Sequence, residues 1–189
     1  MARRAVFLDR DGVLIRDAGL VLGPDDLQIL DGVPEALSAL AGYALVVVSN
    51  QAVVARGLLD EAGVLELQRD LEARLRARGA PELDGFYFCP HHPKATLERY
   101  RQDCPCRKPR PGLLLRAAQE LDLDLGASFM VGDRPSDILA GIRAGCRTVW
   151  VQTGQHEAAP IETTEPFESA PRADHTGPDL MDAARWILG

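Results

Sequence analysis

Residues 5–13 read AVFLDRDGV, and this stretch decides the fold because an apolar run of strand length ends in two carboxylates and a glycine. Side chains alternate along an extended chain, so we expect Asp9 and Asp11 to point the same way. Two carboxylates directed at one spot repel each other unless a cation or a shared proton compensates, and hard oxygen ligands suit Mg²⁺. Taken alone, the same residues also fit a polar strand end with an Asp-Gly turn.

Four further apolar runs have strand length, at 44–49, 85–89, 128–132 and 148–152. The consecutive apolar residues at 45–48 indicate a strand buried on both faces, as in a parallel sheet. Helical spacing fills the gaps between the runs, at 33–40, 64–75, 113–121, 135–144 and 180–188. This alternation predicts an α/β fold with a doubly wound parallel sheet, over a single domain of residues 1–189. Residues 155–178 are predicted to be a loop or a loosely ordered crossover.

The bulk composition is that of an acidic globular protein. The chain has 189 residues, a net charge of −7 and a pI near 5.1, which argues against non-specific binding to nucleic acid or to an anionic membrane. No apolar run reaches the length of a membrane span, and the run behind Arg3 and Arg4 is too short for a signal peptide. We therefore expect a cytoplasmic protein whose four cysteines are thiols or metal ligands rather than disulfides.

Polar residues stand where three of the predicted strands end. Asp9 and Asp11 follow the first strand, Ser49 and Asn50 come at the end of the second, and Asp133 follows the fourth. Open α/β sheets bind ligands at the carboxyl ends of their strands, so these side chains are expected to meet at one edge. Asp133 then adds a third carboxylate for the cation.

Two of the polar residues at this edge have a second interpretation. Ser49 fits either an anion-binding hydroxyl or a simple helix N-cap, and its pattern alone favours the cap. Asp137, four residues after Asp133, either supports the cation site from behind or merely favours the N-terminus of a helix.

A Cys-x-His pair and a Cys-x-Cys pair, separated by twelve residues, predict a structural zinc site in an insert at about 89–106. Thiolate and imidazole ligands in a set of four suit tetrahedral Zn²⁺, and the segment between them has no apolar periodicity with which to fold itself. His92 competes with its neighbour as a ligand, and a chance grouping of thiols is the alternative. The predicted ligands are Cys89, His91, Cys104 and Cys106.

A run of three cations, Arg107, Lys108 and Arg110, follows the insert and precedes a helix. A solvated basic turn accounts for it simply. A phosphate clamp is the sharper interpretation, because arginine offers a planar fork of donors and lysine a point charge.

The order of these motifs, Asp9-x-Asp11, Ser49, Lys108 and Gly132-Asp133, resembles that of the haloacid dehalogenase (HAD) superfamily of phosphohydrolases. The cysteine and histidine insert is similar to that of its small zinc-bearing branch, which includes heptose bisphosphate and histidinol phosphate phosphatases. The stretches that carry the resemblance, over roughly residues 5–154, are LDRDGV, SNQ, ARG, FCPHHP and CRKPRPG.

The resemblance implies a Rossmann-like fold without a large cap domain, and a Mg²⁺-dependent phosphomonoesterase that works through an aspartyl-phosphate. It implies that Asp9 is the nucleophile and Asp11 the general acid and base. Ser49 and Lys108 would hold the transferring phosphoryl group. Mg²⁺ would bind Asp9, the carbonyl of Asp11, and Asp133.

The resemblance also implies a substrate-binding set, in which the family pattern is less closely kept. Leu20 stands where a tyrosine is usual, Ala52 follows Gln51 where Ser-Gly is frequent, and Arg134 replaces a common lysine. The implied set is Asp17, Gly19, Leu20, Asn50, Gln51, Ala52, Arg107, Lys108 and Arg134.

The expected partner is a small phosphorylated metabolite, first a heptose 1,7-bisphosphate or a close sugar phosphate, with histidinol phosphate as the alternative. Neither nucleic acid nor membrane is expected as a partner. A compact fold without a cap suggests a monomer. A non-catalytic binding module organised by zinc is the alternative from a different class, and the convergent carboxylates disfavour it.

Overall fold

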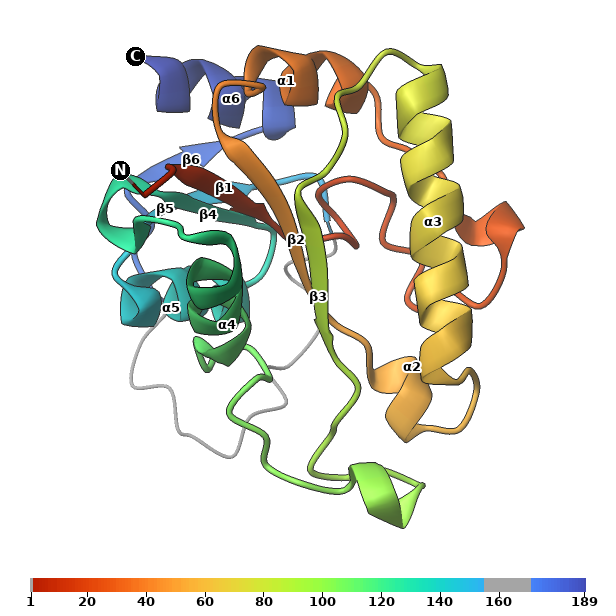
Figure 1. Cartoon of the computed structure of the whole chain (residues 1–189). Coiled ribbons are helices and arrows are strands. Elements are labelled where there is room, and N and C mark those ends of the chain that lie inside the picture. The colour runs from red at the N-terminus through yellow and green to blue at the C-terminus, as the bar shows by residue number, and fades with distance from the viewer. Residues whose placement is uncertain (1, 155–170) are drawn as a thin grey trace.

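The computed structural model describes residues 2–154 and 171–189. Its centre is a parallel sheet in the order β3-β2-β1-β4-β5-β6 (Figure 1). The strands are β1 (Ala5–Leu8), β2 (Ala44–Asn50), β3 (Gly85–Cys89), β4 (Phe129–Gly132), β5 (Arg147–Val151) and β6 (His175–Gly177). The strand order changes direction between β1 and β4, and such a switch point leaves a crevice at the carboxyl ends of the strands.

Helices cover both faces of the sheet (Figure 1). The α-helices are α1 (Val33–Ala39), α2 (Ala52–Ala55), α3 (Glu61–Ala77), α4 (Gly112–Leu121), α5 (Pro135–Ala144) and α6 (Leu180–Leu188). Helices α1, α3 and α6 pack on one face, and α4 and α5 on the other. Three short 3₁₀ helices, η1 (Pro24–Asp26), η2 (Glu98–Tyr100) and η3 (Leu125–Ala127), lie in connections.

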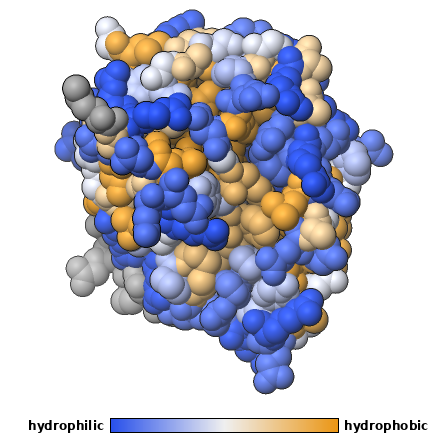
Figure 2. All heavy atoms as spheres, viewed as in Figure 1, coloured by the Kyte–Doolittle hydropathy of each residue, from blue (hydrophilic) through white to orange (hydrophobic). Residues whose placement is uncertain are grey.

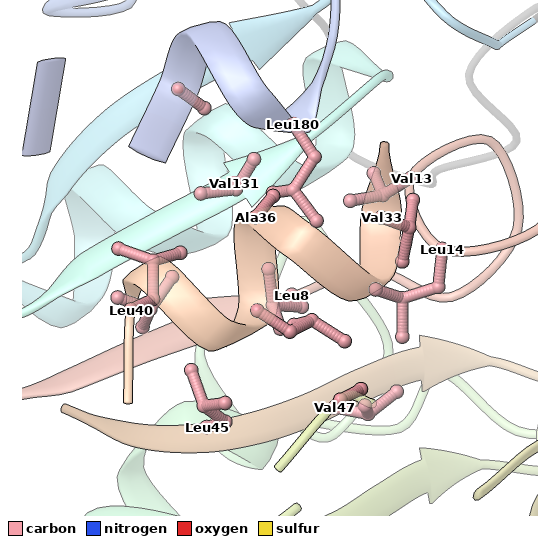
Figure 3. Close-up of a cluster of buried hydrophobic side chains, with 14 of the residues drawn as sticks. Leu8, Val13, Leu14, Val33, Ala36, Leu40, Leu45, Val47, Val131 and Leu180 are labelled. Carbon is pink, nitrogen blue, oxygen red and sulfur yellow. The ribbon is translucent and has the colours of Figure 1, made fainter. Parts of the chain in front are cut away.

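The central strand β1 is buried on both faces. Val6 and Leu8 belong to the core beneath α1, α3 and α6, whereas Ala5 and Phe7 belong to the core beneath α4 and α5. In Figure 3, Leu8 lies among side chains of α1, β2 and α6. Burying one large apolar side chain contributes roughly 1.5–3 kcal/mol, so a strand buried on both faces anchors the carboxylates that follow it.

The predicted fold class is confirmed, and every predicted apolar run overlaps a strand of the sheet to within one residue at each end. The described residues form no separate cap domain. One prediction is wrong, because residues 175–177 form β6, which pairs with β5. This strand is short, lies at the sheet edge and has no apolar run, so no local pattern indicates it. Residues 155–170 of the predicted loop lie outside the described residues.

Strand alternation does not explain the direction of Asp9 and Asp11, because β1 ends at Leu8. The chain then turns tightly, and Leu14 N donates to Arg10 O at 2.9 Å. Gly12 has a φ of +86°, and a Cβ there would lie 2.5 Å from Asp133 Oδ2. Glycine is therefore required, both for the left-handed backbone and for the close approach to Asp133.

The predicted zinc-binding insert extends from the carboxyl end of β3, and η2 lies in it (Figure 1). Hydrophilic residues cover most of the face shown in Figure 2, with hydrophobic patches between them. Among the helices that the structure describes, none combines the length and apolar character of a membrane span.

Candidate active site

A cavity of about 290 Å³ opens at the carboxyl ends of the central strands. It brings together all twelve residues that the sequence placed in catalysis or substrate binding. They are Asp9, Asp11, Asp17, Gly19, Leu20, Ser49, Asn50, Gln51, Ala52, Arg107, Lys108 and Arg134. Asp133 is fully buried beside this cavity. The lining also contains Arg10, Arg56 and Asp137, which the predicted site did not include.

Lys108 joins two carboxylates at the base of the cavity. Its Nζ lies 2.9 Å from Asp9 Oδ1 and 2.7 Å from Asp137 Oδ1, and it donates to Val48 O at 2.8 Å. The three N–H bonds of the ammonium group thus each have an acceptor. Burial by itself lowers the pKa of Lys108, but the charges of Asp137 and Asp9 outweigh it, and the pKa lies above its ordinary value. Lys108 is therefore a fixed cation beside Asp9.

One carboxylate oxygen of Asp9 is held by the described residues of the protein, and the other is not. Its Oδ1 accepts from Arg10 N at 2.8 Å as well as facing Lys108. Both contacts are to the same oxygen, so within the described part of the chain Oδ2 is left for an electrophile or a cation. A carboxylate held in this way is restrained in direction without losing its second oxygen.

Asp133 is a buried carboxyl group whose negative charge, when it is ionised, the protein would compensate poorly. In residues 2–154 and 171–189 neither of its carboxylate oxygens has a hydrogen-bond partner, and Arg134 Nε lies 3.9 Å from Oδ2. Burial, followed by the charges of Asp137 and Asp9, raises the pKa of Asp133 to about 9. One carboxylate oxygen each of Asp9, Asp133 and Asp137 lies within 4.8 Å of the others. This oxygen cluster fits a hard divalent cation such as Mg²⁺.

Asp137 has roles of its own in this cluster. Its Oδ1 faces Lys108, and its Oδ2 accepts from Arg134 N at 3.1 Å at the start of α5. Burial raises the pKa of Asp137 to about 6, against the lowering effect of Lys108. Both predicted alternatives hold in part, because Asp137 accepts a hydrogen bond at the N-terminus of α5 and also pairs with Lys108, which contacts Asp9.

Ser49 lies within β2 and is 1% exposed. The N-cap of α2 is Gln51, and no side-chain cap is formed, so the N-cap interpretation of Ser49 is wrong. Gln51 Nε2 donates to Ser49 Oγ at 2.8 Å. Because Ser49 accepts this bond, its own hydroxyl proton is available to an anionic oxygen in the cavity.

Asn50 contacts the backbone of Lys108 in both directions. Its Nδ2 donates to Lys108 O at 3.0 Å, and its Oδ1 accepts from Lys108 N at 3.0 Å. The family resemblance implies that Asn50 binds substrate, but its amide is already engaged in joining β2 to the loop that carries Lys108. This pairing links residues 58 positions apart, and no sequence spacing indicates it.

Asp17 and Arg134, which both line the cavity, form an ion pair. Arg134 Nη2 lies 2.5 Å from Asp17 Oδ2, and Asp17 Oδ1 accepts from Gly19 N at 2.9 Å. Leu20 is 36% exposed. The loop after Asp11 is thereby tied to the start of α5.

The predicted zinc ligands converge as a separate cluster. One ligand atom from each of Cys89, His91, Cys104 and Cys106 lies within 4.8 Å of the others. His91 Nδ1 is 3.7 Å from the Sγ of Cys89 and 3.8 Å from that of Cys106. His92 is instead directed into its own turn, where its Nδ1 accepts from Lys94 N at 3.0 Å. A set of three thiols and one imidazole fits Zn²⁺.

The zinc-type cluster is joined to the cavity through Arg107. Its Nη1 donates to His91 O at 3.1 Å, and Arg107 itself lines the cavity. Burial lowers the pKa of His91, which favours the neutral imidazole that a metal needs. A metal that organises the insert would therefore also set the position of a cavity cation.

Comparison with known proteins identifies the family. The family model described as HAD-hydrolase-like matches residues 105–183. The D-glycero-beta-D-manno-heptose-1,7-bisphosphate 7-phosphatase of Photorhabdus laumondii is 51% identical over 154 residues, which is 80% of this chain and 81% of the relative. This chain belongs to the heptose bisphosphate phosphatase family of HAD-type hydrolases.

Other members of the heptose bisphosphate phosphatase family agree. The Escherichia coli K12 enzyme of the same name is 46% identical over 187 residues, covering 97% of this chain and 87% of the relative. The crystal structure of D,D-heptose 1.7-bisphosphate phosphatase from B. bronchiseptica, complexed with magnesium and phosphate, matches with a TM-score of 0.79, at 31% identity and 98% coverage of both chains. The protein is a phosphatase, and the predicted family and enzyme class are confirmed.

Proposed function

We propose that this phosphatase removes the 7-phosphate of D-glycero-D-manno-heptose 1,7-bisphosphate or a close sugar phosphate. The relatives at 46–51% identity carry that activity in their names. The observation that carries the chemistry is the position of Asp9, whose Oδ1 is held by Lys108 at 2.9 Å while Oδ2 is left for phosphorus. We infer that the phosphoryl group occupies the base of the cavity, beside Ser49 and Lys108.

In the first step Asp9 attacks phosphorus. A bond forms between the carboxylate oxygen and phosphorus, the bond from phosphorus to the sugar oxygen breaks, and Asp11 donates a proton to the departing alkoxide. The positive charge of Lys108 and the Ser49 hydroxyl stabilise the charge on the phosphoryl oxygens, and preorganised charges and donors of this kind are usually the largest catalytic contribution.

In the second step water attacks the phosphorus of the aspartyl-phosphate. Asp11, now a carboxylate, takes the proton from water, the bond between Asp9 and phosphorus breaks, and inorganic phosphate leaves. Splitting one difficult displacement into two easier ones is the advantage of covalent catalysis.

We infer that Asp9, the backbone carbonyl of Asp11, and Asp133 hold Mg²⁺. Asp133 supports this assignment, because within the described residues neither of its carboxylate oxygens has a hydrogen-bond partner, and burial raises its pKa to about 9, so that a cation is needed to hold it ionised near neutral pH. When bound, Mg²⁺ neutralises charge on the phosphoryl oxygens. Asp137 is excluded from the proposed ligands because Lys108 and the start of α5 engage both of its oxygens.

We infer that the remainder of the cavity recognises the sugar and its second phosphate. Arg107 and Arg134 supply positive charge at the rim. Arginine suits this task because its planar fork can bind two phosphate oxygens at once. The proposed contacts with substrate are made by Asp17, Gly19, Leu20, Gln51 and Ala52, with the two arginines and Lys108.

The zinc cluster is proposed to be structural, since four protein ligands leave no open position. Its thiols must remain reduced to bind metal, which suits the cytoplasm. A monomeric single domain is proposed as well, and sedimentation analysis tests it.

The proposal is tested by turnover of heptose 1,7-bisphosphate and histidinol phosphate side by side, with and without Mg²⁺. We expect Mg²⁺-dependent release of phosphate, a higher kcat/KM for the bisphosphate, and no turnover by Asp9→Asn. Normal thermal unfolding of Asp9→Asn is the control for its fold. A clear preference for histidinol phosphate would overturn the substrate, and appreciable turnover by Asp9→Asn would overturn the nucleophile.

A further inference from the structure

Arg10 is a buried arginine in the middle of the site. It stands between Asp9 and Asp11 in sequence and is 1% exposed, which makes it the largest fully buried side chain of the described residues. Strand alternation would direct it away from its two neighbours. Instead, the turn after β1 returns its guanidinium to the cavity, which it lines.

The guanidinium of Arg10 makes its hydrogen bonds through one nitrogen. Its Nη2 lies 3.2 Å from Asp11 Oδ1, 3.1 Å from Asp11 Oδ2 and 3.1 Å from Gln51 Oε1. Gln51 Nε2 donates in turn to Asp11 Oδ2 at 3.1 Å and to Ser49 Oγ. The three side chains of Arg10, Asp11 and Gln51 thus form a closed triangle that reaches Ser49.

This arrangement fixes the direction of each member. Because Arg10 has only donors, the oxygen of the Gln51 amide must face it, and the amide nitrogen must then face Asp11 and Ser49. Removal of Arg10 would leave that amide free to rotate. Arg10 therefore orients Gln51, and Gln51 in turn orients Asp11 and Ser49, the two groups that face the substrate.

The position of Arg10 is costly for the protein. Its Nε and Nη1 are buried, and within residues 2–154 and 171–189 they have no hydrogen-bond partner. Burial of polar groups without partners, next to a charge, opposes folding. A contribution to the site, rather than to stability, accounts for a buried cation whose guanidinium, among the described residues, hydrogen-bonds only to Asp11 and Gln51.

We propose that Arg10 is a positioning residue, which holds the Asp11 carboxylate and orients Gln51 without touching substrate. The inference rests on the proposed function, in which Asp11 is the general acid and base. In addition to its proposed contact with the substrate, Gln51 thereby helps to position Asp11 and Ser49. Proton transfer requires the acid within hydrogen-bond reach of the leaving oxygen, so a free Asp11 carboxylate would transfer its proton less efficiently.

The test is a double-mutant cycle with Arg10→Met and Asp11→Asn. Acid–base catalysis contributes about 10²–10⁴-fold, so Arg10→Met is expected to lose roughly 10–100-fold in kcat on a sugar phosphate. KM should change by less than about twofold, because no substrate contact is removed. In the Asp11→Asn background, Arg10→Met should cost less than about twofold more, because Arg10 acts mainly through Asp11 and only secondarily through Gln51 and Ser49.

The leaving group supplies a second readout. p-Nitrophenolate departs without a proton, so Arg10→Met should lose at most about a few-fold in the first step on p-nitrophenyl phosphate, followed as the burst of p-nitrophenol. If Arg10 had a merely structural role, Arg10→Met would lower the turnover of both substrates by the same factor. Arg16→Met is the matched control, because Arg16 is exposed and does not line the cavity. It should match the wild type.

Arg10→Lys keeps the buried charge in case Arg10→Met fails to fold. Lysine ends one bond short of Nη2, so we expect a folded protein with about tenfold lower kcat and unchanged KM. Full activity of Arg10→Lys, additive losses in the cycle, or equal losses on both substrates would overturn the inference. Absence of Mg²⁺-dependent turnover in the wild type, or full activity of Asp11→Asn, would instead overturn the proposed function.

Discussion

Lys108 and Asp137 form a buried ion pair, in which Nζ lies 2.7 Å from Oδ1 and both side chains are 1% exposed. The same ammonium group faces Asp9 at 2.9 Å. Lys108 thus contacts both Asp137, with which it forms a buried structural pair, and Asp9, the proposed nucleophile. Stability and catalysis therefore depend on the same cation.

Lys108→Met is therefore expected to lower both stability and turnover. Removing one partner of a buried pair costs about 3–5 kcal/mol, because the remaining charges lose their compensation. Loss of the preorganised cation that holds Asp9 and faces the reacting group is expected to cost roughly 10²–10³ in kcat. Denaturant unfolding and kcat measure the two effects. Arg116→Met, which breaks the exposed pair with Glu120, is the control and should change neither. An unchanged unfolding midpoint would contradict the buried pair.

Asn50→Leu should reduce kcat because it releases the backbone of Lys108. Two hydrogen bonds are lost, at about 0.5–1.5 kcal/mol each, so a modest loss of stability is expected as well. Gln119→Leu, on the exposed face of α4, is a suitable comparison. An effect confined to KM would indicate instead that Asn50 binds substrate directly, as the family resemblance implied.

Cys106→Ser should release zinc and disturb the cavity through Arg107. We expect metal analysis to find about one zinc per chain in the wild type and less than half of that in the variant. KM should rise, because the contact between Arg107 and His91 O depends on the insert. Cys146→Ser removes a thiol outside the cluster and should keep both zinc and KM. Equal zinc content in all three proteins would exclude the four-ligand site.

The metal-free protein should lose stability as the pH rises. The pKa of Asp133 is raised by burial to about 9, so the folded state binds a proton that the unfolded state releases near pH 4. The contribution is fully present below the unfolded pKa and is lost as the pH approaches 9. Mg²⁺ binds the ionised carboxylate, so its stabilising effect should grow over the same range. Thermal unfolding with EDTA or Mg²⁺ measures both trends.

Asp133→Asn supplies the control for this pH dependence. The amide has no charge to bury, so the metal-free variant should unfold at a temperature that changes less between pH 5 and pH 9. The variant should also gain less from Mg²⁺. An identical pH profile in wild type and variant would show that another group is responsible.

The main features of the site were predictable because they depend on local sequence. The apolar run before Asp9 and the run before Asp133 each form a parallel strand. Parallel strands bring their carboxyl ends to one edge, so residues that follow them must meet there. The Cys-x-His and Cys-x-Cys pairs were recognisable for a similar reason, since close spacing within each pair limits where the ligands can point.

Other features were not predictable, because they depend on contacts between distant segments. β6 has no apolar run, and only its pairing with β5 makes it a strand. The choice of His91 over His92 follows from how the insert folds back on β3. The contacts of Asn50 with Lys108, and of Asp17 with Arg134, join segments that are far apart in sequence.

The sequence by itself therefore determined the parallel α/β fold, the family and the types of residue at the strand ends, because burial and strand order act through local pattern. Only the tertiary structure decided which side chain engages which. Asp9 and Asp11 share the cavity because the chain turns at Gly12, rather than because an extended strand alternates. Arg10 reaches Asp11 and Gln51 for the same reason, since a turn directs side chains where no strand periodicity would place them.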